Sequence, residues 1–243
     1  MTNFIIRRLI GIIPTLFVIV TISFFIIRIA PGGPFDFERR LPPEIMRNIE
    51  AKYHLDEPLL KQYGRYLLDV IRGDFGPSYR YPDHDVNYFI FNSLPNSLLL
   101  GSTALFFAVI LGLGAGMISA SKQNSWVDYS SMSFAIIGIT VPLFVIGPVL
   151  MYIFAMKLHW LPTSGWITSK YGILTMIMPV MTLTFPYFAY IARLSRASIL
   201  EILRSDYVRT AKAKGMKASV VMFKHVLKGG LLPVVSYLGP AFA

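Results

Sequence analysis

The sequence predicts an all-α integral membrane protein whose helices form a polytopic bundle. Its 243 residues are 54% hydrophobic and only 15% charged, and the mean hydropathy is +0.56. A soluble domain of this size has too little interior to hide so much apolar surface, so lipid is the natural solvent. The net charge of +10 does not indicate nucleic acid, because the basic residues alternate with bilayer-length apolar segments. We therefore expect membrane lipid, and no nucleic acid, as a partner.

Apolar segments long enough to cross a bilayer set the order of the helices. About twenty residues at ~1.5 Å per residue span a hydrocarbon core of ~30 Å. Four uncharged segments meet that length, namely Leu9 to Ile27 and residues 97–121, 129–156 and 171–192. The first exceeds the core of a cleavable signal, and no small-x-small site follows it, so we expect it to be retained. A fifth segment, 229–243, ends after fifteen residues, so we expect a chain truncated within its bundle.

The distribution of charge predicts a cytoplasmic N-terminus. With that orientation, the inner segments 1–8, 122–128 and 193–228 hold twelve Lys and Arg residues against three acidic ones. The outer segment 30–96 holds eight basic and ten acidic residues. Positive charge in short loops marks the cytoplasmic side of a membrane protein. The predicted organisation is a cytoplasmic start and first helix in 1–29, an extracytoplasmic loop in 30–96, and a helical core in 97–243.

The long outer loop is expected to contain an amphipathic helix. The run Ala30-Pro31-Gly32-Gly33-Pro34 cannot continue the first helix, because proline lacks a backbone donor and glycine is permissive. From Pro58 to Gly73, apolar residues recur at helical spacing. Two interpretations stay open. The helix lies on the outer membrane surface or over a pore entrance, or it packs its apolar face on the rest of the loop.

Two patterns inside the apolar segments bear on helix packing. Gly112 and Gly116 form a G-x-x-x-G pair, which permits close approach of two helices. Prolines predict kinks or breaks, which fit a solvated path and purely structural helices equally well; they are Pro142, Pro148, Pro179 and Pro186. The four complete spans contain no acidic residue and no histidine, which argues against an ion-coupled carrier.

The sequence offers no catalytic or metal-binding constellation. It has no cysteine, and its four histidines fall in separate loops. The run Asp83-His84-Asp85 is interpreted as a solvated loop, since adjacent side chains rarely converge on one ion. No G-x-x-x-x-G-K-[ST] phosphate loop occurs. We therefore expect that the chain is not an enzyme and that it binds no cofactor or metal itself.

The basic segment 193–228 is the most informative part of the sequence, with nine of the twenty-three Lys and Arg residues. Ser205 suits the N-cap of a short helix from Asp206 to Lys214, and Gly215 suits its end. An ordered helix, a glycine turn and a second helix exceed what a loop that only fixes topology requires. The segment is therefore predicted to be a handle for a soluble partner.

The faces of these two helices follow from their spacing. Tyr207, Ala211 and Lys214 are expected on one face, where the small Ala211 lets a partner approach the backbone. The second helix is expected to carry an apolar stripe formed by Met216, Val220, Phe223 and Leu227. Lysines on another face of this helix can reach lipid phosphates; they are Lys217, Lys224 and Lys228.

This segment resembles the characteristic cytoplasmic loop of ATP-binding cassette (ABC) importer permeases of the oligopeptide, dipeptide and nickel group. That loop reads D-Y-V-R-T-A-x-A-K-G, and a hydrophobic–hydrophobic–proline step follows. The matching residues are Asp206, Tyr207, Val208, Arg209, Thr210, Ala211, Ala213, Lys214, Gly215 and Pro233. Residues 30–32 and 73–79 extend the resemblance over essentially the whole chain, which is most similar to the first permease subunit of the oligopeptide type. Lys217 departs from the pattern, where serine or proline would cap the second helix.

The resemblance implies a type I ABC importer permease fold with six transmembrane helices, of which the sixth is absent here. It also implies that the matching residues couple the permease to two cytoplasmic ATPase subunits, which bind the ATP. The other implied partners are a second homologous permease subunit and an extracytoplasmic peptide-binding protein at the bacterial inner membrane. Oligopeptide import is the leading expectation. A dipeptide or nickel importer, and a channel or structural subunit that works without nucleotide, are the alternatives.

Overall fold

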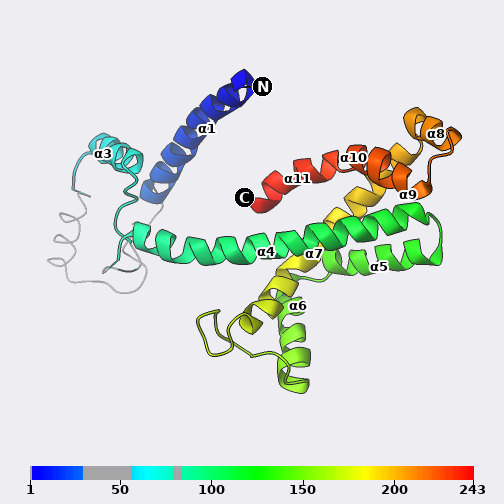
Figure 1. Ribbon diagram of the computed structural model, residues 1–243. Helices are drawn as coiled ribbons and strands as arrows, with labels where there is room; N and C mark the ends of the chain where they lie inside the picture. The colour runs from blue at the N-terminus through cyan, green and yellow to red at the C-terminus, as the bar shows by residue number, and fades with distance from the viewer. Residues whose placement is uncertain (1, 30–55, 79–80, 82–83) are drawn as a thin grey trace. The chain divides into compact units, whose positions relative to one another are not determined.

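The computed structural model describes residues 2–29, 56–78, 81 and 84–243. Within them the regular structure is helical, apart from one isolated β-bridge (Figure 1). Among the described residues, three helices are long and apolar enough to cross a membrane, or up to five spans if each of two bent helix pairs counts as one. The predicted all-α, polytopic class is confirmed. The chain divides into two compact units, Met1–Leu94 and Pro95–Ala243.

The first unit joins a long apolar helix to the amphipathic one. Helix α1 covers Thr2–Ile29, and α3 covers Leu59–Ile71. The Tyr63 hydroxyl of α3 lies 2.6 Å from the Thr21 hydroxyl of α1. The Phe24 ring, only 4% exposed, packs against the Tyr63 ring at 5.3 Å. The amphipathic helix therefore places its tyrosine side on α1, a contact that neither interpretation of the sequence included.

A tight turn follows α3 and contains the glycine-rich part of residues 73–79. Gly73 and Gly76 both have positive φ, at 79° and 78°, a region that favours glycine. The Asn87 side chain closes the turn, because it donates to the Gly73 carbonyl at 2.6 Å and accepts from the Phe75 amide at 2.9 Å. These residues thus serve to start the next helix. The predicted helix breaker at 30–34 lies outside the described residues.

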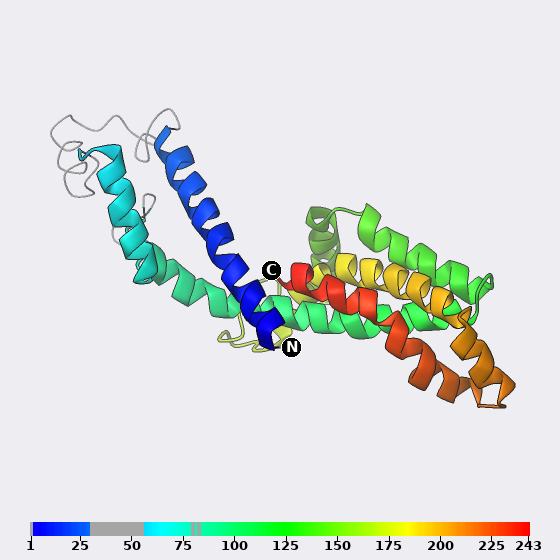
Figure 2. The same cartoon turned by 90° about the horizontal axis from the view of Figure 1, so that it is seen from above.

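The second unit is a helical bundle around α7 (Figures 1 and 2). Helix α4 begins at Val86 in the first unit, ahead of the apolar segment 97–121, and continues into the second unit. Helix α7 continues past residue 192 into the basic segment. The elements, some of them π-helical and labelled η, are α4 (Val86–Ser121), α5 (Trp126–Thr140), α6 (Leu143–Leu150), η1 (Met151–Lys157), α7 (Leu174–Leu203), α8 (Asp206–Ala213), α9 (Ala218–Val220), η2 (Val221–Val226), α10 (Leu227–Gly230) and α11 (Leu232–Phe242).

The predicted single span 129–156 is a bent pair, α5 and α6 with η1, with an angle of 106°. The break falls at Val141, which is extended with φ −82° and ψ 122°. Proline disfavours the helical conformation in the residue before it, so Pro142 is the physical cause. The other three prolines lie inside helices that continue through them; they are Pro148 in α6, and Pro179 and Pro186 in α7.

Glycines set the distance between α4 and α7. A Cβ at Gly112 would lie 2.8 Å from the Ile191 Cγ2, and one at Gly116 would lie 2.7 Å from the Ala192 carbonyl. Real Cβ atoms do not approach so closely, so both positions require glycine. The G-x-x-x-G pair, whose spacing permits close approach, does form a close helix contact. It lies beside an apolar core that includes Ala108, Ala135, Phe188 and Val234.

Candidate coupling site

The basic segment is helical through most of its length. Helix α7 ends at Leu203, Ser205 follows, and α8 begins at Asp206. In both views α8 lies at the same end of the second unit as the turn between α4 and α5 (Figures 1 and 2). The candidate site is therefore a short helix at one end of the bundle, next to the junction of three longer helices.

The two ends of α8 differ from each other in their local chemistry. Ser205 has extended backbone at the N-cap position, but its hydroxyl donates to the Ile202 carbonyl at 2.6 Å and does not cap α8. The position of the cap was predicted correctly, and its hydrogen bond was not. At the other end the helix stops at Ala213, and Gly215 has φ +73°, the left-handed conformation predicted for it.

Helix α8 has one face buried by its own chain. Val208 is 0% exposed and Ala211 is 5% exposed. The prediction that Ala211 faces a partner is therefore wrong. The two apolar residues are three positions apart, so they share a helical face, and this face turns inward. The exposed residues of the predicted site are Asp206, Tyr207, Arg209, Thr210, Ala213, Lys214 and Gly215.

The apolar stripe predicted for the second helix is only half right. Met216 and Leu227 pack against the buried apolar residues of the chain, but Val220 and Phe223 do not. Val221 and Val226 are buried, whereas Phe223 is 63% exposed and Val220 is 40% exposed. The cause is the π-helix η2, in which residues five apart share a face, so the α-helical spacing assumed from the sequence does not apply. The helix starts directly after Lys217, which provides no side-chain cap.

An apolar cluster lies beneath α8 and joins it to distant parts of the sequence. Its buried members are Ala120, Ile199, Val208, Ala211, Val221 and Val226. Close by, the Ser198 hydroxyl of α7 donates to the Gly230 carbonyl of α10 at 2.7 Å. Pro233, by contrast, lies in the first turn of α11, beyond a bend of 48°. The structure thus brings residues 206–215 together and places Pro233 on a different helix.

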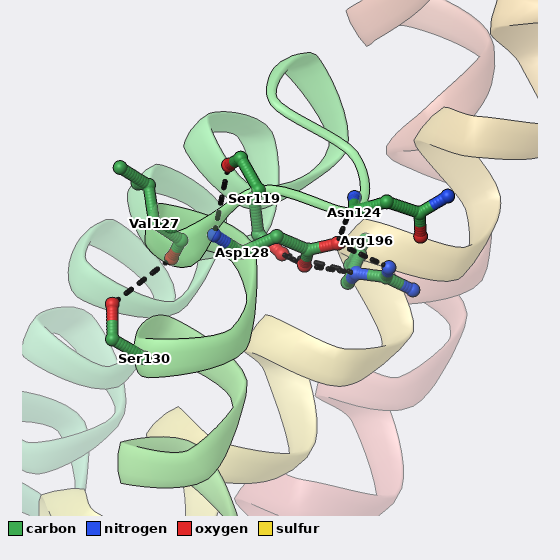
Figure 3. Close-up of polar contacts among 7 residues, drawn as sticks. Ser119, Asn124, Val127, Asp128, Ser130 and Arg196 are labelled. Atoms are coloured by element: carbon green, nitrogen blue, oxygen red, sulfur yellow. Dashed lines mark hydrogen bonds and ion pairs between the residues drawn. The ribbon is translucent and has the colours of Figure 1, made fainter.

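A buried ion pair lies close to this cluster, and the sequence did not predict it. The Arg196 guanidinium of α7 donates to both carboxylate oxygens of Asp128 in α5, from Nε at 2.7 Å and from Nη2 at 2.6 Å (Figure 3). The Ser119 hydroxyl of α4 donates to the same carboxylate, and the backbone N–H of Asn124 donates to it at 2.9 Å. The available signal was an acidic residue at the start of one apolar helix and an arginine near the end of another.

The described residues contain no group of three His, Cys, Asp or Glu side chains placed to hold a metal ion. The exposed face of α8 holds an ion pair between Asp206 and Arg209, with 3.5 Å between their charged atoms. Exposed pairs of this kind contribute little to stability.

A bundle of apolar helices long enough to cross a membrane, with a short exposed helix at one end, is the architecture expected of a membrane permease. Residues 112–243 match the family of binding-protein-dependent transport system inner membrane components. Residues 1–97 match the family of N-terminal regions of binding-protein-dependent transport system membrane components. The chain belongs to this family of ABC importer permeases, and the resemblance stated from its motifs is confirmed.

Within this family the chain is similar to permeases of peptide transport systems. The chain is 51% identical over 242 residues to the oligopeptide transport system permease protein OppB of Escherichia coli strain K12. It is 52% identical over 244 residues to OppB of Haemophilus influenzae, and 40% identical over 243 residues to the dipeptide transport system permease protein DppB of Bacillus subtilis. In each case the match covers 100% of this chain and 78% of the relative.

Proposed function

We propose that this chain is a permease subunit of an ABC importer that carries oligopeptides across the bacterial inner membrane. The observation that carries the substrate assignment is the identity of 51–52% to oligopeptide permeases over the whole chain. The dipeptide permease of B. subtilis, at 40%, makes dipeptides the second candidate. The chain supplies no ATP site or cofactor of its own in this proposal, so the energy comes from two separate ATPase subunits.

The exposed face of α8 is the surface on which an ATPase subunit docks. Val208 and Ala211 hold the helix on its own chain, which leaves Tyr207, Thr210 and Ala213 free to contact a partner. The positive-inside bias puts the N-terminus and segment 193–228 in the cytoplasm and the 30–96 loop outside. A second permease subunit lies alongside, and an extracytoplasmic peptide-binding protein delivers substrate to the outer face.

Anchoring gives α8 a mechanical role. Because Val208 and Ala211 pack in one cluster with Ile199 of α7, a displacement of α8 also displaces the end of α7. Nucleotide binding that closes the ATPases therefore shifts the helix bundle between inward-facing and outward-facing arrangements. Such a shift requires that the ATPases contact α8 differently in the two states.

Crosslinking tests the docking surface directly, since the natural chain has no cysteine. Thr210→Cys and Ala213→Cys, each in the assembled importer, are expected to crosslink to an ATPase subunit. Leu60→Cys is the control, because this residue is 77% exposed in α3, on the side proposed to face outward. Absence of crosslinks from both α8 positions in an intact complex would contradict the proposal.

Uptake separates the candidate substrates and the alternative mechanism. Cells that lack this subunit are complemented with it and supplied with labelled oligopeptide, dipeptide or nickel. Oligopeptide uptake that requires the ATPase subunits is the expected result. Uptake that persists after removal of the ATPases would indicate a nucleotide-independent channel instead.

A further inference from the structure

We propose that the Asp128–Arg196 ion pair, together with Ser119, is a positioning element that makes the ends of α4, α5 and α7 move as one body when α8 moves. This inference rests on the proposed function of α8. It assigns a transport role to residues outside the family motif, on three separate helices.

The geometry of the pair resists both sliding and rotation. Both Asp128 oxygens accept hydrogen bonds, and the donors come from α7, from α4 and from the turn between α4 and α5. A planar guanidinium that donates through two nitrogens fixes the orientation of its partner as well as the distance. Helices joined in this way keep their register, whereas an apolar contact alone would let them slip.

Burial makes the pair costly to separate. The Asp128 side chain is 2% exposed and the Arg196 side chain is 26% exposed. Removing one partner would leave the other charge without its counter-charge, which is strongly unfavourable for a buried group such as Asp128. Arg193, one turn earlier on α7, provides a contrast, because it is exposed and forms no ion pair with any described residue.

The Asp128–Arg196 ion pair is adjacent to the apolar cluster in which Val208 and Ala211 of α8 are buried. Ser119 precedes Ala120, which belongs to that cluster, and Arg196 lies three residues before Ile199, which belongs to it as well. Helices α4 and α7 are also in close contact one turn away, where a Cβ at Gly116 would collide with Ser195. A displacement of α8 is therefore passed through Ala120 and Ile199 to the ion pair, and from it to α5.

Distance measurements between spin labels test this rigid connection. Labels at Lys122→Cys and Glu201→Cys, both exposed, report the separation between the α4–α5 turn and the end of α7 in the assembled importer. In the otherwise unchanged chain this separation is expected to be the same with and without bound ATP. With Arg196→Gln it is expected to change when ATP binds, and oligopeptide uptake is expected to fall at least tenfold while ATP hydrolysis continues.

Matched variants distinguish positioning from folding. Arg193→Gln removes a charge from the same helix and is expected to change neither the label separation nor oligopeptide uptake. Arg196→Lys is expected to restore uptake only partly, because lysine lacks the planar guanidinium that donates through two nitrogens. If Arg196→Gln does not assemble, Asp128→Asn replaces it.

A separation that changes with ATP in the otherwise unchanged chain overturns the inference without any ion-pair variant. So does wild-type uptake in an assembled Arg196→Gln importer. Loss of the α8 crosslinks with a constant separation would instead contradict the proposed function of α8.

Discussion

Ala211 and Ala213 lie two residues apart on α8 and face opposite environments. Ala211 is 5% exposed and packs in the cluster beneath the helix, whereas Ala213 is exposed. The same residue type thus serves two purposes. Ala211 lets the helix approach its own chain closely, and Ala213 lies on the face where we propose that an ATPase subunit docks.

Substitution of the two alanines separates anchoring from docking. Ala211→Glu buries a charge among apolar side chains and is expected to lower the free energy of unfolding by about 3 kcal/mol or more. Ala213→Glu is expected to change it by less than about 0.5 kcal/mol, as at an ordinary surface position, while still reducing peptide uptake. Thermal unfolding of the purified subunit and uptake by cells measure the two effects. Equal loss of stability in both variants would contradict this division.

The sequence predicted where α8 ends better than it predicted which face of α8 is buried. Gly215 ends the helix because few other residues adopt its positive φ, and that requirement is local. The burial of Ala211 depends on Ala120 and Ile199, and the partner of Asp128 is Arg196, so both depend on segments distant in the sequence. In the sequence, Asp128 and Arg196 only contributed to the count of charges that predicts topology. Residue spacing within one helix could not show that they form a pair, because they lie on two different helices.

At the scale of elements, α4 and α7 form a contact in which glycine permits close approach. Gly116 faces Ala192 and Ser195 of α7, while Gly114 has no atom within 4 Å of the place a Cβ would occupy. The two glycines share one helix and differ only in which face they occupy.

Alanine at these two positions tests the contact. Gly116→Ala is expected to destabilise the subunit by about 2 kcal/mol, because overpacking forces the helices apart. Gly114→Ala is expected to be neutral or to stabilise by up to about 1 kcal/mol, since alanine favours a helix over glycine. The midpoint of thermal unfolding in detergent measures both. A Gly116→Ala variant as stable as Gly114→Ala would show that α4 and α7 do not approach closely.

Element boundaries were predictable where a single residue sets them. Pro142 breaks the α5–α6 span because the residue before a proline avoids the helical conformation, although the angle of 106° depends on packing. The π-helix η2 could not be predicted, because its apolar residues also fit an α-helical pattern. Val220 and Phe223 were assigned to the wrong face for that reason, whereas Met216 and Leu227 do pack against the core.

At the scale of the whole molecule, hydropathy predicted a membrane protein, and charge asymmetry predicted its orientation. The first prediction is confirmed by the family and by the apolar helices. The orientation, and the division of the chain at residues 29 and 96, remain predictions. They depend on the positive-inside bias, which sets the orientation during membrane insertion and cannot be seen in the folded structure.

Labelling with a membrane-impermeant thiol reagent tests the orientation in intact cells. Leu60→Cys in α3 is expected to react from outside, and Lys212→Cys in α8 is expected to react only after the cells are opened. Both residues are exposed, so accessibility to the reagent reports the side of the membrane. Reaction of Lys212→Cys in intact cells would reverse the topology and remove α8 from the cytoplasm.

The π-helical turn between α9 and α10 gives this chain a place where a residue can be lost at small structural cost. A π-turn accommodates at least one residue more than the α-helical turn it replaces. A deletion within 221–226 would let the backbone tighten to ordinary α-helix, and Gly229 and Gly230 would keep facing α7. A deletion in α7 would instead rotate every following side chain by about 100° around the axis. Natural length variation in this part of the molecule should therefore collect in η2.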